Sequence, residues 1–188
     1  MMMKKLLAVL LCLSPVLALA HPGHDTNGVM AGLMHPVGGW DHLLAMVAVG
    51  LWAATFSGKA RWLIPTTFIG VMAAGFVLGI NGIHIPMTEQ SIAASVLILG
   101  LAAAWVKKMP TAAAMILVGV FALFHGLAHG AEMGAHGALG YALGFVLATA
   151  ALHAAGFGLG CVSVKHAWLR RVSGSLIGLI GFGMLMGA

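Results

Sequence analysis

Six long apolar segments follow one another along the chain, each bounded by glycine, proline or charged residues. The apolar runs are continuous rather than alternating, which favours α-helices over β-strands. At about 1.5 Å per residue, their lengths suit the roughly 30 Å hydrocarbon layer of a bilayer. We therefore expect an all-α integral membrane protein, with a six-transmembrane-helix bundle in residues 36–188. The expected helices are Pro36–Phe56, Trp62–Ile80, Glu89–Val106, Thr111–Ala131, Ala138–Val162 and Ala167–Gly187.

A different pattern precedes the first of these segments. Within residues 1–20, two lysines are followed by a short apolar run and an Ala-Leu-Ala motif. This order is typical of a secretory signal peptide, and the run is short for a span of about 20 residues. We predict that residues 1–20 are cleaved, with an uncleaved anchor as the alternative. Residues 21–35 would then form a short periplasmic, histidine-containing arm.

Composition and charge agree with this picture. The chain of 188 residues is 61% hydrophobic and 7% charged, whereas soluble domains carry about 25% charged residues. The formal charge of +5 is spread over short loops, so we expect no nucleic-acid partner. All basic residues after residue 20 fall on one side of the six expected spans, which the positive-inside rule makes cytoplasmic. The protein is then a multi-pass protein of a bacterial inner membrane with both mature termini in the periplasm.

Glycine is frequent, with 27 residues, and several glycines are four positions apart. Small residues at this spacing let helices approach closely in lipid. We expect a compact bundle in contact with membrane lipid, and the same pattern allows a homo-oligomer. The repeated pairs are Gly75/Gly79, Gly126/Gly130, Gly140/Gly144 and Gly174/Gly178.

Two stretches combine acidic side chains with histidines inside this apolar background. The first runs from His35 to Met46 and contains Asp41 and His42. An ionisable side chain at the centre of a spanning helix costs about 2.5–3.5 kcal/mol on insertion scales, so such residues usually have a function. The second contains three such residues at spacing i, i+4, i+7, which places them within about 60° on one helix face. They are His125, His129 and Glu132.

The expected topology places both stretches in the outer half of the membrane, so they can form one site. Two carboxylates offset the charge of a divalent cation, and imidazoles suit nickel, cobalt, zinc and copper. The Irving–Williams order prevents affinity alone from selecting one of these metals. The predicted metal ligands are His35, Asp41, His42, His125, His129 and Glu132.

The remaining histidines are weaker candidates for metal ligands. Those in the arm and in the outer loops are candidates to bind the ion on its way in, namely His21, His24, His84 and His136. The alternative for the arm is a mobile tail that happens to contain histidines. His153 and His166 lie apart from both stretches, and we interpret them as a packing residue and a loop residue, with a position along an exit path as the alternative for either.

At the two stretches the sequence resembles the HupE/UreJ family of nickel and cobalt permeases. The matching runs are His35-Pro36-Val37-Gly38-Gly39-Trp40-Asp41-His42-Leu43-Leu44-Ala45-Met46 and Phe124-His125-Gly126-Leu127-Ala128-His129-Gly130-Ala131-Glu132. A signal peptide, a histidine-rich mature start and about six spans are also similar to that family. The resemblance implies uptake of Ni²⁺ or Co²⁺ for metalloenzyme maturation or cobalamin synthesis, with these same residues at the site.

We therefore expect a transporter rather than an enzyme, with the divalent metal ion as cargo and no resident cofactor. The sequence contains no nucleotide-binding motif, so any use of ATP would need a partner protein. The first alternative is an intramembrane metalloenzyme that uses the same site with zinc. The second is a haem protein with histidines as axial ligands, although it leaves Asp41 and Glu132 without a role.

Overall fold

The computed structural model describes residues 28–105, 109–133, 137–164 and 166–187. In this part of the chain it contains seven α-helices and no strand. Five of them, α4 to α8, are long and apolar enough to cross a membrane. The chain is therefore a multi-pass helical membrane protein; the count of six spans stays a prediction, and the expected signal peptide lies outside the described residues. The helices are α2 (Gly28–Gly38), α3 (Trp40–Ala53), α4 (Ala60–Ile80), α5 (Thr88–Trp105), α6 (Thr111–Glu132), α7 (Ala138–Val164) and α8 (Ala167–Gly187).

The second to sixth predicted segments agree with α4 to α8, with each boundary within two residues of the observed one. The first segment differs. It is divided into α2 and α3 by Gly39, whose backbone is extended with φ −109° and ψ 122°. The prediction that a helix begins at Pro36, with His35 outside it, is wrong, because both residues lie in the last part of α2.

Packing against α7 explains why α2 forms despite its proline. Pro36 has no N–H to donate to the carbonyl of the preceding turn, and it lies in the last turn of α2. Gly28 and Gly32 of α2 lie directly on the backbone of α7, which has Gly140 and Gly144 at the facing positions. This contact orders residues that the sequence suggested were a polar arm.

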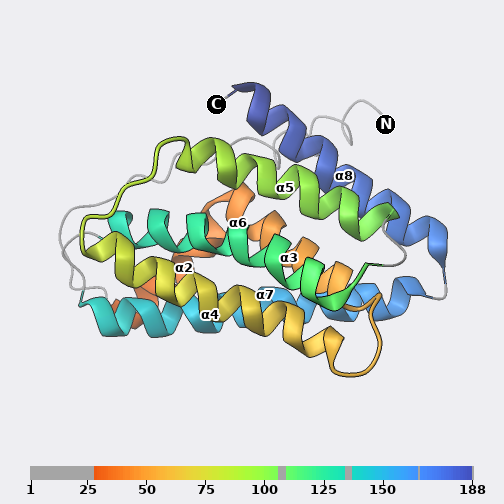
Figure 1. Cartoon of the computed structure of the whole chain (residues 1–188), viewed down its shortest axis with the longest axis horizontal. Helices are drawn as coiled ribbons and strands as arrows, with labels where there is room; N and C mark the ends of the chain where they lie inside the picture. Colours follow the sequence, from red (N-terminus) through yellow and green to blue (C-terminus); the bar gives the residue numbers. More distant parts are fainter. Residues whose placement is uncertain (1–27, 106–108, 134–136, 165, 188) are drawn as a thin grey trace, which may run out of the picture.

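Three helix pairings build the bundle (Figure 1). α2 and α3 lie one after the other along α7, α4 lies beside α6, and α5 crosses α8 at the opposite edge from α7. The glycine contacts show that α2 and α3 run in the same direction as α7, that α4 runs in the same direction as α6, and that α5 and α8 are antiparallel. These directions are the ones that alternating spans require.

Close glycine contacts join neighbouring helices of the same chain. A Cβ placed at Gly75 of α4 would lie 2.6 Å from the carbonyl oxygen of Leu123 and 3.2 Å from Gly126 of α6. Gly174 of α8 similarly faces Gly100 of α5, where an added Cβ would lie 2.7 Å from the carbonyl oxygen. The repeated glycine pairs thus join helices inside one bundle, and a homo-oligomer stays a prediction.

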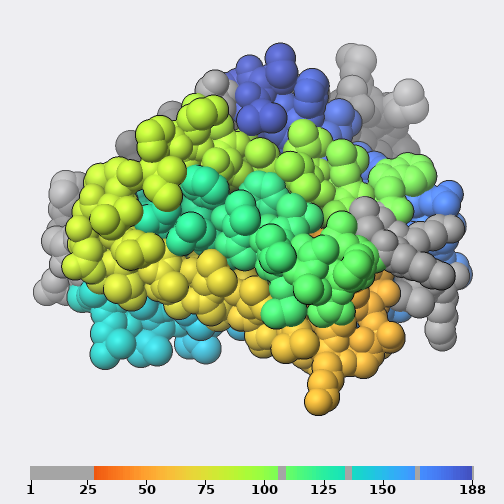
Figure 2. Space-filling model, viewed as in Figure 1, coloured from red at the N-terminus to blue at the C-terminus, as the bar shows by residue number. Residues whose placement is uncertain are grey.

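The two ends of the bundle differ in the connections they carry. The segment between α4 and α5 lies at one end, and the segment between α3 and α4 lies at the other (Figure 1). His84 is exposed in the first connection and Lys59 in the second. Side chains of α4, α5 and α6 cover most of the face drawn in Figure 2. The buried cluster beneath includes Trp52, Phe68, Phe76, Tyr141 and Phe145.

Candidate metal centre

The break at Gly39 positions Asp41 and His42 at the start of α3. One oxygen of the Asp41 carboxylate accepts the backbone N–H of His42 at 2.8 Å and lies 2.7 Å from Nδ1 of its ring. A carboxylate only accepts, so Nδ1 donates and the lone pair of Nε2 is available. This is the arrangement in which a carboxylate orients a metal-binding histidine. Gly39 makes room for it, since a Cβ there would lie 2.6 Å from the Asp41 carboxylate.

The α6 half of the site lies on one face near the end of that helix. His125 donates from Nδ1 to the carbonyl oxygen of Phe121 at 3.0 Å, which leaves its Nε2 as the second lone pair of the site. His129 is fully buried, and neither of its ring nitrogens has a hydrogen-bond partner among the described residues. Glu132, one turn further, is exposed at the helix end.

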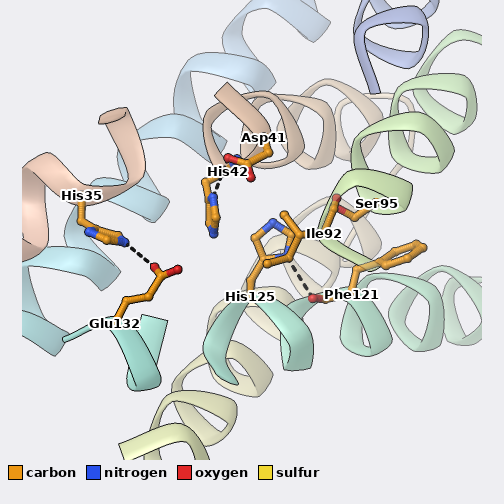
Figure 3. A network of polar contacts seen from close by, with 8 residues as sticks. All are labelled: His35, Asp41, His42, Ile92, Ser95, Phe121, His125 and Glu132. Carbon is orange, nitrogen blue, oxygen red and sulfur yellow. Dashed lines mark hydrogen bonds and ion pairs between the residues drawn. The ribbon is translucent and has the colours of Figure 1, made fainter. Parts of the chain in front are cut away.

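The two halves meet although they are far apart in sequence. The ring of His42 lies 4.2 Å from that of His129 and 5.0 Å from that of His125, measured between centroids. His35 of α2 lies 4.7 Å from His129, and its Nε2 is 3.0 Å from an oxygen of Glu132. Figure 3 shows His35, His42 and Glu132 directed toward one another from three different helices. The structure thus brings together all six residues predicted as ligands.

The donor atoms of this cluster fit a cation. One ligand atom each from His35, His129 and Glu132 lie within 4.8 Å of one another. In addition, Nε2 of His42, Nε2 of His125 and both ring nitrogens of His129 are buried without a partner in the described residues. A buried polar group left unpaired costs about 1–3 kcal/mol. A divalent ion that accepts these lone pairs removes part of this cost, and the carboxylates balance its charge.

A cavity of about 540 Å³ leads to the cluster, and it contains an acidic residue that the sequence analysis missed. Glu89, at the start of α5, lines this cavity and also a neighbouring one of about 230 Å³. The expected topology already placed residue 89 at the outer end of its helix, and that position was the available signal. The larger cavity is lined by Ala31, Met34, His35, Gly38, Gly39, Asp41, His42, Glu89 and Glu132.

Of the four histidines predicted to bind the ion on its way in, the structure describes only His84. His84 lines the smaller cavity, together with Glu89 and Glu132, so it lies next to the cluster. His21, His24 and His136 lie outside the described residues. Their role stays a prediction.

Fold and site together define a multi-pass helical membrane protein with a cluster of imidazoles and carboxylates between its helices. Residues 8–184 match the protein family described as HupE / UreJ protein. The chain is also 47% identical over 176 residues to a protein described as Protein HupE from Rhizobium leguminosarum bv. viciae, and the match covers 92% of each chain. The protein therefore belongs to the HupE/UreJ family, as the two stretches indicated. No solved structure matches the chain.

Proposed function

We propose that this protein takes up a divalent transition-metal cation, Ni²⁺ or Co²⁺, across the bacterial inner membrane. The observation that carries the proposal is the meeting of His35, His42, His129 and Glu132 from three helices, with unpaired imidazole nitrogens directed into one cluster. Membership of the HupE/UreJ family supports the same function. No observation on the site specifically favours a zinc enzyme or a haem protein.

The chemistry of the donors suits this cargo. Imidazole nitrogens bind nickel and cobalt more readily than magnesium or calcium, which prefer sites built from oxygen alone. Asp41 and Glu132 can offset the two positive charges, and Glu89 adds negative charge along the cavity that leads to them. The cation exchanges its water ligands for these groups as it moves from the cavity into the cluster.

The divided first segment also supports transport. Interrupted helices are found in transporters where carbonyl oxygens at the end of a half-helix face an ion. The last residues of α2 border the cavity, and α3 begins with the Asp41–His42 pair. Non-helical backbone at membrane depth is tolerated where it lines such a space rather than lipid. The helix break at Gly39 then lines the path of the ion.

Flux measurements test the proposal. Purified protein in liposomes is expected to accumulate radioactive Ni²⁺ or Co²⁺, and unlabelled nickel, cobalt, zinc and copper in competition identify the preferred ion. Asp41→Ala and His42→Ala should abolish accumulation at unchanged protein levels in the membrane. Wild-type protein that carries none of these ions, or variants that carry them normally, would contradict the proposal.

A further inference from the structure

His153 of α7 is a buried histidine that belongs to neither of the two stretches that form the site. Only 4% of it is exposed, and neither of its ring nitrogens has a hydrogen-bond partner among the described residues. If this residue only filled space, an apolar side chain would cost less free energy to bury, because both nitrogens of His153 lose their hydrogen bonds to water. Two unpaired nitrogens in the core therefore point to a ligand that binds here.

The position of His153 is deeper in the bundle than the cluster. Tyr141, whose ring lies 5.6 Å from that of His35, precedes it on the same helix by twelve residues, or about 18 Å of rise. The backbone of His153 lies against Gly50, close to the end of α3. His153 is thus displaced toward the end of the bundle where α3 connects to α4.

One aromatic ring separates His153 from the cluster. Phe68 of α4 is fully buried, and its ring lies 5.5 Å from His125 and 5.2 Å from His153, edge to face with both. A single buried ring therefore lies between the two histidines. No other residue has ring contacts to both in the described part of the chain.

The neighbours of His153 suit a soft cation that is held weakly. Thr149, one turn earlier on α7, directs its hydroxyl toward Sδ of Met72 at 3.8 Å, and both residues are fully buried. Imidazole and thioether favour late transition metals over magnesium or calcium. A cavity of about 250 Å³ borders His153, with Gly50, Trp62, Pro65 and Phe157 among its walls. No carboxylate lines this cavity, and Thr149 and Met72 lie outside its lining, so a cation beside His153 would meet no negative charge from the cavity walls.

We propose that His153, together with Thr149 and Met72, forms a second ion-binding position that receives the cation after it leaves the outer cluster. This inference rests on the proposed transport function. A path through a membrane needs sites that bind strongly enough to admit an ion and weakly enough to release it. The acidic outer cluster meets the first need and the neutral inner position meets the second, with Phe68 between them.

Liposome flux and equilibrium binding of Ni²⁺ or Co²⁺ alone test the inner position. His153→Ala and His153→Phe should slow initial uptake about tenfold or more, and His153→Met, which keeps a soft donor, should slow it less. All three should bind the ion at the outer cluster with wild-type affinity, which also reports correct folding. His42→Ala should lose both binding and uptake, and His166→Ala, an exposed histidine elsewhere, should keep both.

The outcomes separate this inference from the function it rests on. If wild-type protein carries no ion, the transport proposal fails. If wild type carries the ion and His153→Phe restores the rate that His153→Ala lowers, His153 only fills space and the inner position is wrong. Uptake by both variants at the wild-type rate, or loss of equilibrium binding in both, also overturns it.

Discussion

Nε2 of His35 lies 3.0 Å from Oε2 of Glu132, although the two residues are 97 positions apart. The side chains are 32% and 47% exposed. A pair this accessible contributes only about 0–1 kcal/mol to folding, because water screens it. Its position next to His129 and at the wall of the cavity therefore fits the proposed ion-binding role better than a role in stability.

Replacing Glu132 should separate binding from folding. Glu132→Gln keeps the size of the side chain and removes its charge, so the affinity for Ni²⁺ or Co²⁺ should fall about tenfold or more. Without ion, the free energy of unfolding should change by less than about 1 kcal/mol. Equilibrium dialysis and thermal unfolding in detergent measure the two quantities. Glu132→Asp, which keeps the charge, is the matched control, and equal affinity of all three proteins would contradict the role.

The two adjacent glycines at the break should differ in their tolerance of a methyl group. A Cβ at Gly39 would lie 2.6 Å from the Asp41 carboxylate and 3.2 Å from Nδ1 of His42, whereas one at Gly38 has no atom within 4 Å. Gly39→Ala should thus displace the Asp41–His42 pair and lower ion uptake markedly. Gly38→Ala should have the smaller effect. Similar uptake by both variants in the liposome assay would show that the pair does not depend on this space.

Glycine packing between α4 and α6 should contribute to stability. A Cβ at Gly126 would lie 2.7 Å from the backbone nitrogen of Phe76, and rigid backbone cannot move aside cheaply. Gly126→Ala should lower the free energy of unfolding by about 1–3 kcal/mol. Gly70→Ala, with no atom within 4 Å, should leave it unchanged or raise it by up to about 1 kcal/mol, since alanine favours helix. Thermal unfolding in detergent compares them, and equal midpoints would refute the packing role.

Arg170 should also stabilise the bundle. Its guanidinium is buried and donates to the carbonyl oxygens of Ala103 and Ala104 at 2.7 and 2.8 Å, near the end of α5. Arg170→Met should cost about 1.5–3 kcal/mol, because a charged donor is lost and buried carbonyls remain. Arg171→Met, which removes an exposed guanidinium over Trp105, should cost less than about 1 kcal/mol. Equal thermal midpoints for the two variants would contradict this difference.

Labelling of single cysteines should establish the orientation. The basic residues predict that residue 83 faces the periplasm and residue 57 the cytoplasm. Both positions are exposed, so Ile83→Cys and Ser57→Cys can be made in a protein that lacks Cys161 and Cys12. A membrane-impermeant maleimide should label the first variant in intact cells and the second only after permeabilisation. The reverse pattern would invert the topology.

The sequence was sufficient to predict five helices because their apolar runs end at charged residues, glycine or proline. The sequence led to a wrong prediction at the first segment, where the helix preferences of single residues conflict with the packing of the helix. Pro36 is typical of a helix start, and His35 before it is disfavoured in a helix. The contact of Gly32 with α7 overrides both preferences, and it depends on residues more than a hundred positions away. Such a contact cannot be derived from local pattern.

The candidate site, like the helices, could be predicted from the sequence only in part. The spacing of His125, His129 and Glu132 gives one helix face, and the loop charges place it level with Asp41. The loop charges also place Glu89 at the outer end of its helix, but neither signal shows that α5 lies against the cavity, which is what gives Glu89 its importance. The unpaired nitrogens of His153 are also invisible in sequence, where a lone histidine suggests ordinary packing.

The placement of α2 and α3 along α7 has a consequence for biogenesis. Synthesis proceeds from the N-terminus, so the segment that carries His35 and His42 leaves the ribosome well before α7 exists. Gly32 of α2 and Gly50 of α3 find their partners only around Phe145 and His153. A nascent chain that stops after α6 has all six proposed outer ligands but lacks α7, the helix against which α2 with His35 and α3 with His42 pack. The cell thus makes a competent protein only when translation is almost complete.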